Sequence, residues 1–192
     1  MVIKFKNYKL LSENENLRLL DIRNLKSVRK NSKNMDCIKI DNHLNWVNNL
    51  NNKKNIYYAI EINENIVGGI NVIQINVKEN FAYWGLFFTD DNLPLISSLV
   101  TYLFLDRVFN ILNFNELKSE VMTSNINAYK FSLNFGLKVY GEFKSNNIDY
   151  YKMHITKDEW NENKYKGYAK MISRRIDRID SSFIDNTEEN KK

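Results

Sequence analysis

FAYWGLFFT (residues 81–89) opens the stretch that decides the fold. This aromatic run has the composition and length of a strand. The segment LPLISSLVTYLFLDRVFNIL (93–112) follows, and it is apolar on more than one face, as a buried helix is. In ELKSEVM (116–122), apolar and small residues alternate with charged ones, which is the period of a strand. With INAYKFSLNF (126–135) as a second helix, the stretch predicts the order strand, helix, strand, helix.

Residues on either side of that second helix mark its ends. Asn125 precedes the helix and is placed to cap its first turn. Gly136 follows the helix and suits the left-handed conformation in which many helices end. Beyond it, Leu137–Phe143 and Asp149–Ile155 predict a terminal antiparallel pair of strands, joined through Lys144–Asn147.

The N-terminal part predicts a strand and two helices. Residues 3–11 alternate between apolar residues and lysines, which indicates an opening strand. Ser12 and Glu15 have the spacing of a capping box, so we expect a helix over residues 13–23. A second helix is expected to begin at Asp41.

A hairpin is predicted between these helices and the central stretch. Residues 56–62 and 66–77 read as strands, and Asn63–Asn65 reads as the turn between them. Gly68 and Gly69 lie inside the second strand, where they indicate a bulge or a close approach of another backbone.

The C-terminal part has a different composition. Residues 157–180 are highly charged, with apolar residues at helical spacing, so we expect one extra helix. Residues 181–192 are polar and are expected to form a frayed tail. A basic amphipathic helix can bind a membrane surface or a partner. We favour a peripheral helix that lies on the domain or serves dimerisation, and a homodimer is left open.

Composition limits the class of protein. The chain has 192 residues, of which 43% are hydrophobic, and this suits one globular domain with a sizeable core. No apolar run is long enough for a membrane span, and no signal-peptide core opens the chain, so we expect a cytoplasmic protein. The net charge of +5 favours anionic partners, but the basic residues are scattered, which argues against nucleic acid. One cysteine and two histidines, far apart, predict no metal site.

Four segments carry a resemblance to a known family. They are Ile22–Asn24, Asp41–Trp46, Tyr83–Leu86 and the run EVMTSNINA (120–128). With the strand–helix order above, they resemble the GNAT acyltransferases, which use acyl-CoA. Within that superfamily the chain looks most like bacterial sugar-nucleotide N-acetyltransferases acting on UDP-4-amino-4,6-dideoxy-N-acetyl-altrosamine in the pseudaminic acid pathway.

The resemblance implies a fold and a domain division. The fold would be α/β (α+β), with a central, twisted, mixed but mostly antiparallel sheet of about seven strands flanked by helices. Residues 1–160 would form the GNAT acyltransferase domain. Residues 161–192 would add the charged C-terminal helix and the polar tail.

The resemblance also implies where acetyl-CoA, or another acyl-CoA, would bind. The backbone N–H groups of Leu86, Phe87 and Phe88 correspond to those that pair with pantetheine and face the thioester oxygen. Asn125 corresponds to a second pantetheine ligand, although it is also the helix cap. The family's glycine-rich pyrophosphate loop is replaced by TDDNLPLISS (89–98), so Ser97 and Ser98 are the donors left for the phosphates. The two aspartates of this loop would repel them.

Three residues are candidates for moving protons. In the family, a tyrosine hydroxyl protonates the departing thiolate, and its position here holds Ser132. Tyr129 lies one helical turn earlier and is the alternative donor. Glu120 matches a family glutamate and would accept a proton from the attacking amine, unless it is only a charge on the solvated side of a strand.

The acceptor side is better preserved. By resemblance, Arg23, His43 and Tyr83 match positions that hold the nucleotide sugar. The alternatives are that Arg23 is a helix C-terminal charge, that His43 is a surface residue, and that Tyr83 is part of the core. Two further family contacts, a threonine and a lysine, would fall on Ile73 and Gln74, which suggests a different nucleotide or sugar orientation.

Three functions remain open from the sequence. The first is transfer of an acyl group, expected to be acetyl, to the amine of a UDP- or dTDP-linked amino-dideoxy sugar in surface glycan biosynthesis. The second is acetylation of a protein N-terminus. The third is a non-catalytic binding domain of the GNAT type that has lost the use of CoA.

Overall fold

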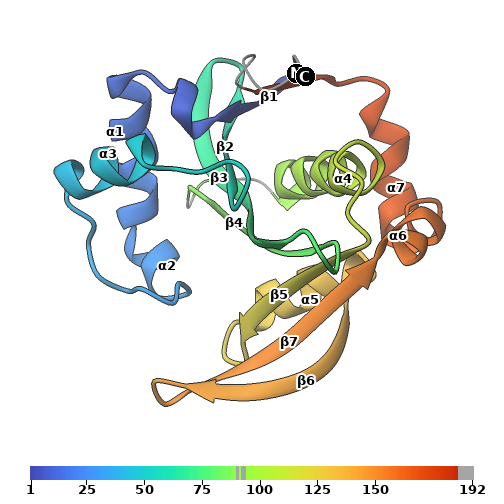
Figure 1. Ribbon diagram of the computed structural model, residues 1–192. Helices are drawn as coiled ribbons and strands as arrows, with labels where there is room; N and C mark the ends of the chain where they lie inside the picture. Colours follow the sequence, from blue (N-terminus) through green and yellow to red (C-terminus); the bar gives the residue numbers. More distant parts are fainter. Residues whose placement is uncertain (90, 92–93, 186–192) are drawn as a thin grey trace. The chain divides into compact units, whose positions relative to one another are not determined.

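The computed structural model describes residues 1–89, 91 and 94–185 (Figure 1). The chain forms two compact units. The first contains residues 1–73, 85–93 and 178–192, and the second contains residues 74–84 and 94–177. Strand β4 (Phe81–Phe88) begins in the second unit and ends in the first.

Five strands contribute to the first unit. They are β1 (Val2–Asn7), β2 (Ile56–Ile62), β3 (Asn65–Asn76) up to residue 73, the end of β4, and β8 (Asp180–Ile184). Their order is β4-β3-β2-β1-β8. The β1–β2 and β2–β3 pairs are antiparallel, whereas β8 runs parallel to β1. Asn63 and Glu64 have φ angles of 47° and 71°, so the predicted hairpin turn is confirmed.

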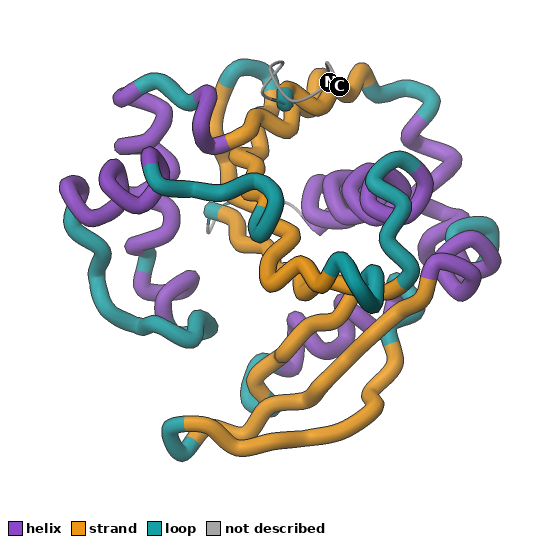
Figure 2. The backbone as a smooth tube through the Cα atoms, in the orientation of Figure 1, coloured by secondary structure: helices purple, strands orange, loops and turns teal. Residues whose placement is uncertain are grey.

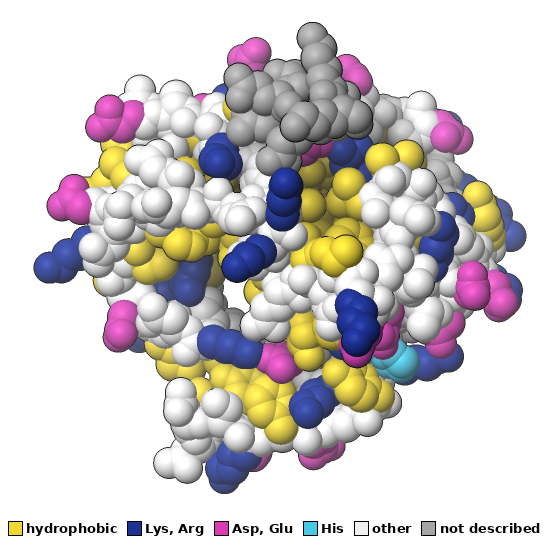
Figure 3. Space-filling view, in the orientation of Figure 1, with side chains coloured by type: hydrophobic (Ala, Val, Ile, Leu, Met, Phe, Trp, Pro, Cys, Tyr) yellow, Lys and Arg dark blue, Asp and Glu magenta, His cyan; other side chains and the backbone are white. Residues whose placement is uncertain are grey.

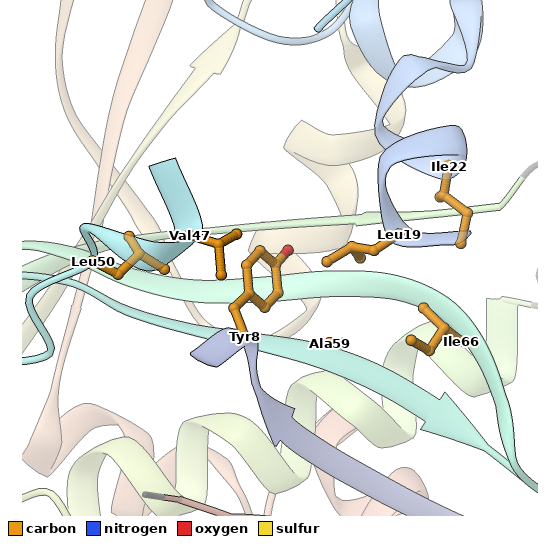
Figure 4. Packing of buried hydrophobic residues seen from close by; sticks show 7 residues of the cluster. All are labelled: Tyr8, Leu19, Ile22, Val47, Leu50, Ala59 and Ile66. Atoms are coloured by element: carbon orange, nitrogen blue, oxygen red, sulfur yellow. The ribbon is translucent and has the colours of Figure 1, made fainter. Parts of the chain in front are cut away.

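The helices of the first unit surround a small apolar cluster. They are the 3-10 helix η1 (Tyr8–Leu10), α1 (Glu13–Asn24), α2 (Lys26–Arg29) and α3 (Ile40–Asn48). The predicted capping box is present at the start of α1. Figure 4 shows the cluster, in which α1 and α3 meet the hairpin strands: Tyr8, Leu19, Ile22, Val47, Leu50, Ala59 and Ile66. Phe87 of β4 packs against it.

The two glycines of β3 lie where another chain segment comes very close. A Cβ atom on Gly68 would overlap the carbonyl oxygen of Phe87, and one on Gly69 would overlap the side chains of Tyr8 and Phe87. The Thr89 N–H donates to the Val67 carbonyl at 2.8 Å, next to this contact. The predicted close backbone approach is therefore confirmed, and it is the end of β4 that approaches.

In the part of the chain that is described, the second unit combines four helices with the last three residues of β3 (74–76) and four other strands. The strands are the start of β4, β5 (Glu116–Met122), β6 (Lys138–Ser145) and β7 (Ile148–Thr156), in the order β6-β7-β5-β4. The helices are α4 (Pro94–Asn110), α5 (Ile126–Asn134), α6 (Lys157–Asn163) and α7 (Gly167–Ile176). The β6–β7 and β5–β7 pairs are antiparallel, and β4 and β5 are parallel.

The sheet of the second unit has two unlike faces, because side chains alternate along each strand. One face is buried and carries Ala82, Leu117, Met153 and Ile155. Helix α4 packs on it through Phe104, whose ring centroid lies 6.2 Å from that of Trp84. Helix α5 lies behind β5 and β7 in Figure 1. The other face, called the open face here, carries Tyr83, Glu116, Lys118, Glu120, Lys152 and His154.

The fold class is confirmed as a mixed sheet flanked by helices. Two expectations about detail are wrong. The described residues form eight strands, in keeping with about seven, but β8 forms over residues 180–184, where a frayed tail was predicted. The C-terminal helix is two helices, α6 and α7, because the chain turns at Gly167 with a φ angle of 49°. The proposed boundary at residue 160 stays a prediction.

The C-terminal helices are packed and not free. Ile172 and Ala169 of α7 are buried, and the Trp160 ring of α6 packs against Tyr102 of α4 at 5.1 Å. Lys164 reaches Asp106 at 2.9 Å. These contacts favour the peripheral helix over the membrane-surface alternative. Within the described residues, no helix is both long enough and apolar enough to cross a membrane.

Candidate functional site

Arg23 is a desolvated cation at the end of α1 in the first unit. Its Nη2 donates to the Asn34 carbonyl at 3.0 Å, in the long loop between α2 and α3 that Figure 2 shows in teal. Its Nη1 is buried and has no hydrogen-bond partner. Burial lowers the pKa of Arg23, Tyr8 opposes this, and Arg29 adds to it. No carboxylate of the described residues pairs with Arg23.

His43 of α3 is buried, at 5% exposure, so the alternative of a surface residue is wrong. Its Nε2 lies 3.1 Å from the Asn16 side-chain oxygen, which accepts, so Nε2 carries the proton. Burial lowers the pKa of His43. The ring is therefore neutral near pH 7 and presents Nδ1 as an acceptor.

Aromatic rings that the sequence analysis did not select lie beside His43. The Trp46 ring centroid lies 5.9 Å from His43, 6.1 Å from Tyr8 and 4.8 Å from Tyr57. Trp46 is 40% exposed, whereas burial raises the pKa values of Tyr8 and Tyr57. Tyr8 neighbours both the Trp46 ring and the Arg23 guanidinium, and an indole and a guanidinium in one region suit a ligand that has both a flat ring and an anionic group. Trp46 and Tyr57 can be read from the sequence as aromatic residues, but the sequence does not show that their rings lie close together.

The cofactor candidates Leu86, Phe87 and Phe88 lie at the end of β4, in the first unit. Phe87 is fixed by the apolar cluster and by the glycines of β3. The register between β4 and β5 covers only Phe81–Tyr83 and Glu116–Lys118 among the described residues, although β4 continues to Phe88. Strand backbone that leaves a parallel partner is the arrangement that an extended ligand arm can pair with.

The proposed pyrophosphate loop is described only in part, since residues 90, 92 and 93 lie outside the described range. A hydrogen bond from Thr89 lowers the pKa of Asp91, which keeps this carboxylate charged. The Ser98 hydroxyl donates to the Pro94 carbonyl at 2.9 Å and lies 2.7 Å from the Tyr168 hydroxyl. Ser98 is also only 1% exposed. Its side chain is therefore occupied within the protein, and the role of Ser97 as a phosphate donor stays a prediction.

The proposed donors to the thiolate lie on α5, in the second unit. Asn125 caps this helix, since its side-chain oxygen accepts from the Ala128 N–H at 3.2 Å. Tyr129 packs on Tyr151 with 4.8 Å between ring centroids, and Ser132 is buried. Tyr151 pairs with Val121 and points away from the open face. Tyr129 therefore lies on the opposite side of the sheet from Glu120.

The open face carries a connected set of titratable groups, called the open-face network here. The His154 Nδ1 lies 2.7 Å from Glu116 Oε1, and Lys118 Nζ lies 3.2 Å from Glu116 Oε2. The Tyr140 ring contacts the His154 ring at 5.0 Å and hydrogen-bonds to Tyr83. In the lower part of Figure 3, where β6 and β7 lie, basic and acidic side chains mix with hydrophobic surface.

The environment of the network perturbs one of its tyrosines. Desolvation of the Tyr140 hydroxyl, together with Tyr83, Glu116 and Glu120, raises the pKa of Tyr140 to about 12. Tyr140 stays protonated near neutral pH and can donate to Tyr83. Tyr83 is partly exposed on the open face, so the alternative that it belongs to the core does not hold.

Sequence reasoning missed three members of this network: Glu116, Tyr140 and His154. They come from three different strands, and Lys118 faces His154 only through the register of β5 and β7. The period-two pattern of β7 showed that His154 shares a face with Lys152, but it did not show what that face meets. No group of three or more potential metal ligands occurs in the described part of the chain.

Comparison with known proteins identifies one family. The family model for the acetyltransferase (GNAT) domain matches residues 14–156. No curated protein matches the sequence. Among solved structures, the spermidine N-acetyltransferase from Vibrio cholerae in complex with CoA and spermine is similar, with a TM-score of 0.72 and 15% identity over 83% of this chain and 98% of that one.

A second solved structure is similar to a comparable extent. The Campylobacter jejuni N-acetyltransferase PseH in complex with acetyl coenzyme A has a TM-score of 0.64 and 22% identity over 80% of this chain and 98% of that one. At these identities, both likenesses concern the fold. They do not decide between an amino-sugar acceptor and a polyamine acceptor.

Proposed function

The chain belongs to the acetyltransferase (GNAT) domain family, and on this basis we propose that it transfers an acyl group from acyl-CoA to the amine of a nucleotide-linked amino-dideoxy sugar. Acetyl is the simplest acyl group, and the nucleotide is UDP or dTDP. The family supports the transfer reaction and the acyl-CoA co-substrate. The choice of acceptor rests on the side chains of this chain.

The observation that carries the acceptor class is the state of Arg23. A guanidinium that is half-buried, without a carboxylate partner in the described residues and with an unsatisfied Nη1, bears a desolvation cost that Tyr8 offsets only in part. The diphosphate of a nucleotide sugar offsets it with planar, charge-assisted hydrogen bonds. A polyamine would bring further positive charge to the same place.

The open face of the second unit supports the same choice. A polyamine acceptor requires carboxylates whose charge is not already compensated. Glu116 is held between Lys118 and His154, and Glu120 faces Lys152 across the β5–β7 register. Glu116 therefore has a cation beside it and Glu120 has one opposite it in the register, so the described part of this face presents no cluster of carboxylates without cations nearby to a polycation.

The residues present fit an acyl-CoA, with one opposing feature. The backbone of Leu86–Phe88 would pair with pantetheine and donate to the thioester oxygen as it gains charge. Ser97 and Asn125 would add contacts, while the charge of Asp91 opposes the phosphates. Bound in this way, the thioester supplies an activated carbonyl carbon.

The proposed reaction is direct attack of the sugar amine on that carbon. Tyr83 would orient the acceptor, as the resemblance suggests, and Ser132 or Tyr129 would supply the proton to the thiolate. Since a thiol has a pKa of about 8.5, the thiolate is a fair leaving group even with a weak donor. Donor and acceptor of protons would act from opposite sides of the β5 strand, because Tyr129 and Glu120 lie on opposite faces.

The test compares four amine acceptors and asks whether acetylation of the preferred one depends on the charge of Arg23. Acetyl-CoA is supplied with a UDP-linked 4-amino-4,6-dideoxy sugar, the same sugar without its nucleotide, spermidine, or a peptide with a free N-terminus. We expect amide product with the nucleotide sugar, detected by mass spectrometry. Arg23→Gln should lower kcat/KM for it by roughly 10- to 100-fold, the value of a charge-assisted hydrogen bond.

A control and a contrary result complete the test. Lys30→Gln removes an exposed cation close by in sequence and should leave kcat/KM unchanged. The sugar without its nucleotide should be insensitive to Arg23→Gln. Preferred acetylation of spermidine or of the peptide, unaffected by Arg23→Gln, would sink the proposal. The absence of product with every amine would favour a non-catalytic binding domain.

A further inference from the structure

We propose that His154 is the proton acceptor for the attacking amine, oriented by Glu116 and connected through Tyr140 to Tyr83. This inference rests on the proposed acyl transfer and deepens it, since it assigns a role to a histidine outside every motif of the sequence. All four residues belong to the second unit and share its open face.

The orientation of the imidazole is the first argument. A carboxylate can only accept a hydrogen bond, so the Glu116 contact at 2.7 Å fixes the proton of the neutral ring on Nδ1. The lone pair then resides on Nε2. Within the part of the chain that the structure describes, Nε2 has no hydrogen-bond partner. A carboxylate behind an imidazole, with the far nitrogen open, is the arrangement of a general base.

The second argument is the connection to the acceptor side. Tyr140 touches the His154 ring and hydrogen-bonds to Tyr83. Tyr83 forms the last β4–β5 register pair with Lys118, so it lies where β4 parts from β5. By the resemblance, Tyr83 is also a residue that holds the acceptor. The two hydroxyl groups can therefore pass a proton from the acceptor toward Nε2 of His154.

The third argument concerns the charges around the ring. Lys118 of β5 and Lys138 of β6 both face His154 across the strands. The ammonium of Lys118 lies against Glu116 and the Phe81 ring, and that of Lys138 is paired with Glu159. Each cation is thus held by its own partner. Glu116 remains the charge in direct contact with the ring, and it stabilises the imidazolium that forms when Nε2 accepts a proton.

The bonds and protons of the step balance. The amine nitrogen forms a bond to the acyl carbon, and the C–S bond breaks with its electron pair leaving on sulfur. The proton lost by nitrogen passes to Tyr83 and the Tyr83 proton passes to Tyr140. The Tyr140 proton reaches Nε2 of His154 through a water molecule, because no hydrogen bond joins the two groups directly among the described residues. Both tyrosines end neutral, and the imidazolium later releases its proton to water. No metal or redox partner is required.

The first measurement does not depend on activity. The chain has only two histidines, so a long-range ¹H–¹⁵N spectrum of the full-length protein resolves both rings, and His154→Gln assigns them. At a pH where the rings are neutral, we expect the proton of His154 on Nδ1. Glu116→Gln should shift the ring toward the Nε2–H tautomer. A wild-type ring that is already in the Nε2–H form would overturn the proposal.

The second measurement uses acetyl-CoA and the UDP-linked 4-amino-4,6-dideoxy sugar. His154→Ala should lower kcat by roughly 100-fold, the lower end for loss of a general base, with KM values nearly unchanged. Added imidazole should restore part of kcat, which a merely structural role would not allow. Glu142→Gln, an exposed glutamate on β6, is the matched control for Glu116→Gln and should behave as wild type.

The outcomes separate this proposal from the one on which it rests. If the wild type acetylates the sugar and His154→Ala keeps its kcat, or gains nothing from imidazole, the role of His154 is refuted and the acyl transfer stands. Loss of kcat in Glu120→Gln alone would assign the base to Glu120 instead. If the wild type acetylates no amine, both proposals fail together.

Discussion

The two groups of candidate residues differ in the surroundings of their charged side chains. In the first unit, Arg23 is a half-buried cation with an unsatisfied Nη1 and no carboxylate partner among the described residues, and burial lowers the pKa values of Arg23 and His43. On the open face of the second unit, Glu116 lies against the Lys118 ammonium and hydrogen-bonds to His154.

This difference separates binding from proton transfer. A cation without a counterion gains most when a ligand supplies the anion, so the Arg23 region is built to bind. A carboxylate, an imidazole and two phenols that already touch one another can exchange protons without taking up an ion from solution. The proposed acyl transfer needs both properties.

The largest expected effect is the loss of stability when a Cβ atom is added to a closely packed glycine of the first unit, compared with a glycine of the second unit that has more space. A Cβ on Gly68, in the first unit, would overlap the Phe87 carbonyl, whereas a Cβ on Gly141, in the second, would lie 3.8 Å from the Lys152 side chain. We expect Gly68→Ala to lower the free energy of unfolding by about 3 kcal/mol, because backbone cannot give way cheaply. Gly141→Ala should change it by less than about 0.5 kcal/mol.

Urea denaturation followed by circular dichroism measures both values. Gly85→Ala, which meets Asn71 at an ordinary 3.7 Å, is a second control within β4. If Gly68→Ala unfolds at the same urea concentration as wild type, the end of β4 is not held as closely by β3 as the structure shows.

Removing one charge from each region should change stability in opposite directions. Arg23→Met keeps the apolar stem and removes a desolvated cation, so we expect the free energy of unfolding to rise by about 1 kcal/mol while acetylation of the nucleotide sugar falls. Glu116→Gln leaves Lys118 and His154 without their carboxylate, and we expect a loss of up to about 1 kcal/mol. Thermal unfolding of the two variants measures the signs, and equal signs would contradict the comparison.

The elements were predictable wherever local pattern decides them. Strands 56–62 and 116–122 have the predicted bounds, and the Ser12–Glu15 capping box and the Asn125 cap are present. Strand β8 was not predictable, because its sequence DSSFI is polar. It becomes a strand by pairing with β1, at the other end of the chain, where Phe183 stacks on Phe5 at 4.1 Å.

The site was predictable to the extent that it depends on residue type and position along the chain. Arg23 and Tyr83 follow from the resemblance, but no sequence shows that a cation lacks a counterion in space. The pairing of Glu116 with His154 depends on the register of two strands separated by a helix and a third strand. The arrangement of the charged groups in three dimensions therefore decides which candidate residues bind a ligand and which transfer protons.

The smallest expected effect is the pH dependence that the buried His43 imposes on stability. Its pKa in the unfolded chain is 6.5, and burial lowers it in the folded protein. Below pH 6.5 the unfolded chain therefore takes up a proton that the folded protein refuses, so stability falls as the pH falls, and above 6.5 this residue contributes no slope. One proton limits that slope to about 1.4 kcal/mol per pH unit.

His43→Gln removes the titrating group and can still hydrogen-bond to Asn16, so its stability should be less sensitive to acid. Other groups titrate in the same range, so the informative quantity is the difference in unfolding free energy between wild type and variant, measured in urea from neutral to mildly acidic pH. Parallel curves would mean that His43 is protonated as readily in the folded protein as in the unfolded chain, and the contrast between a desolvated first unit and a paired second unit would then rest on Arg23 alone.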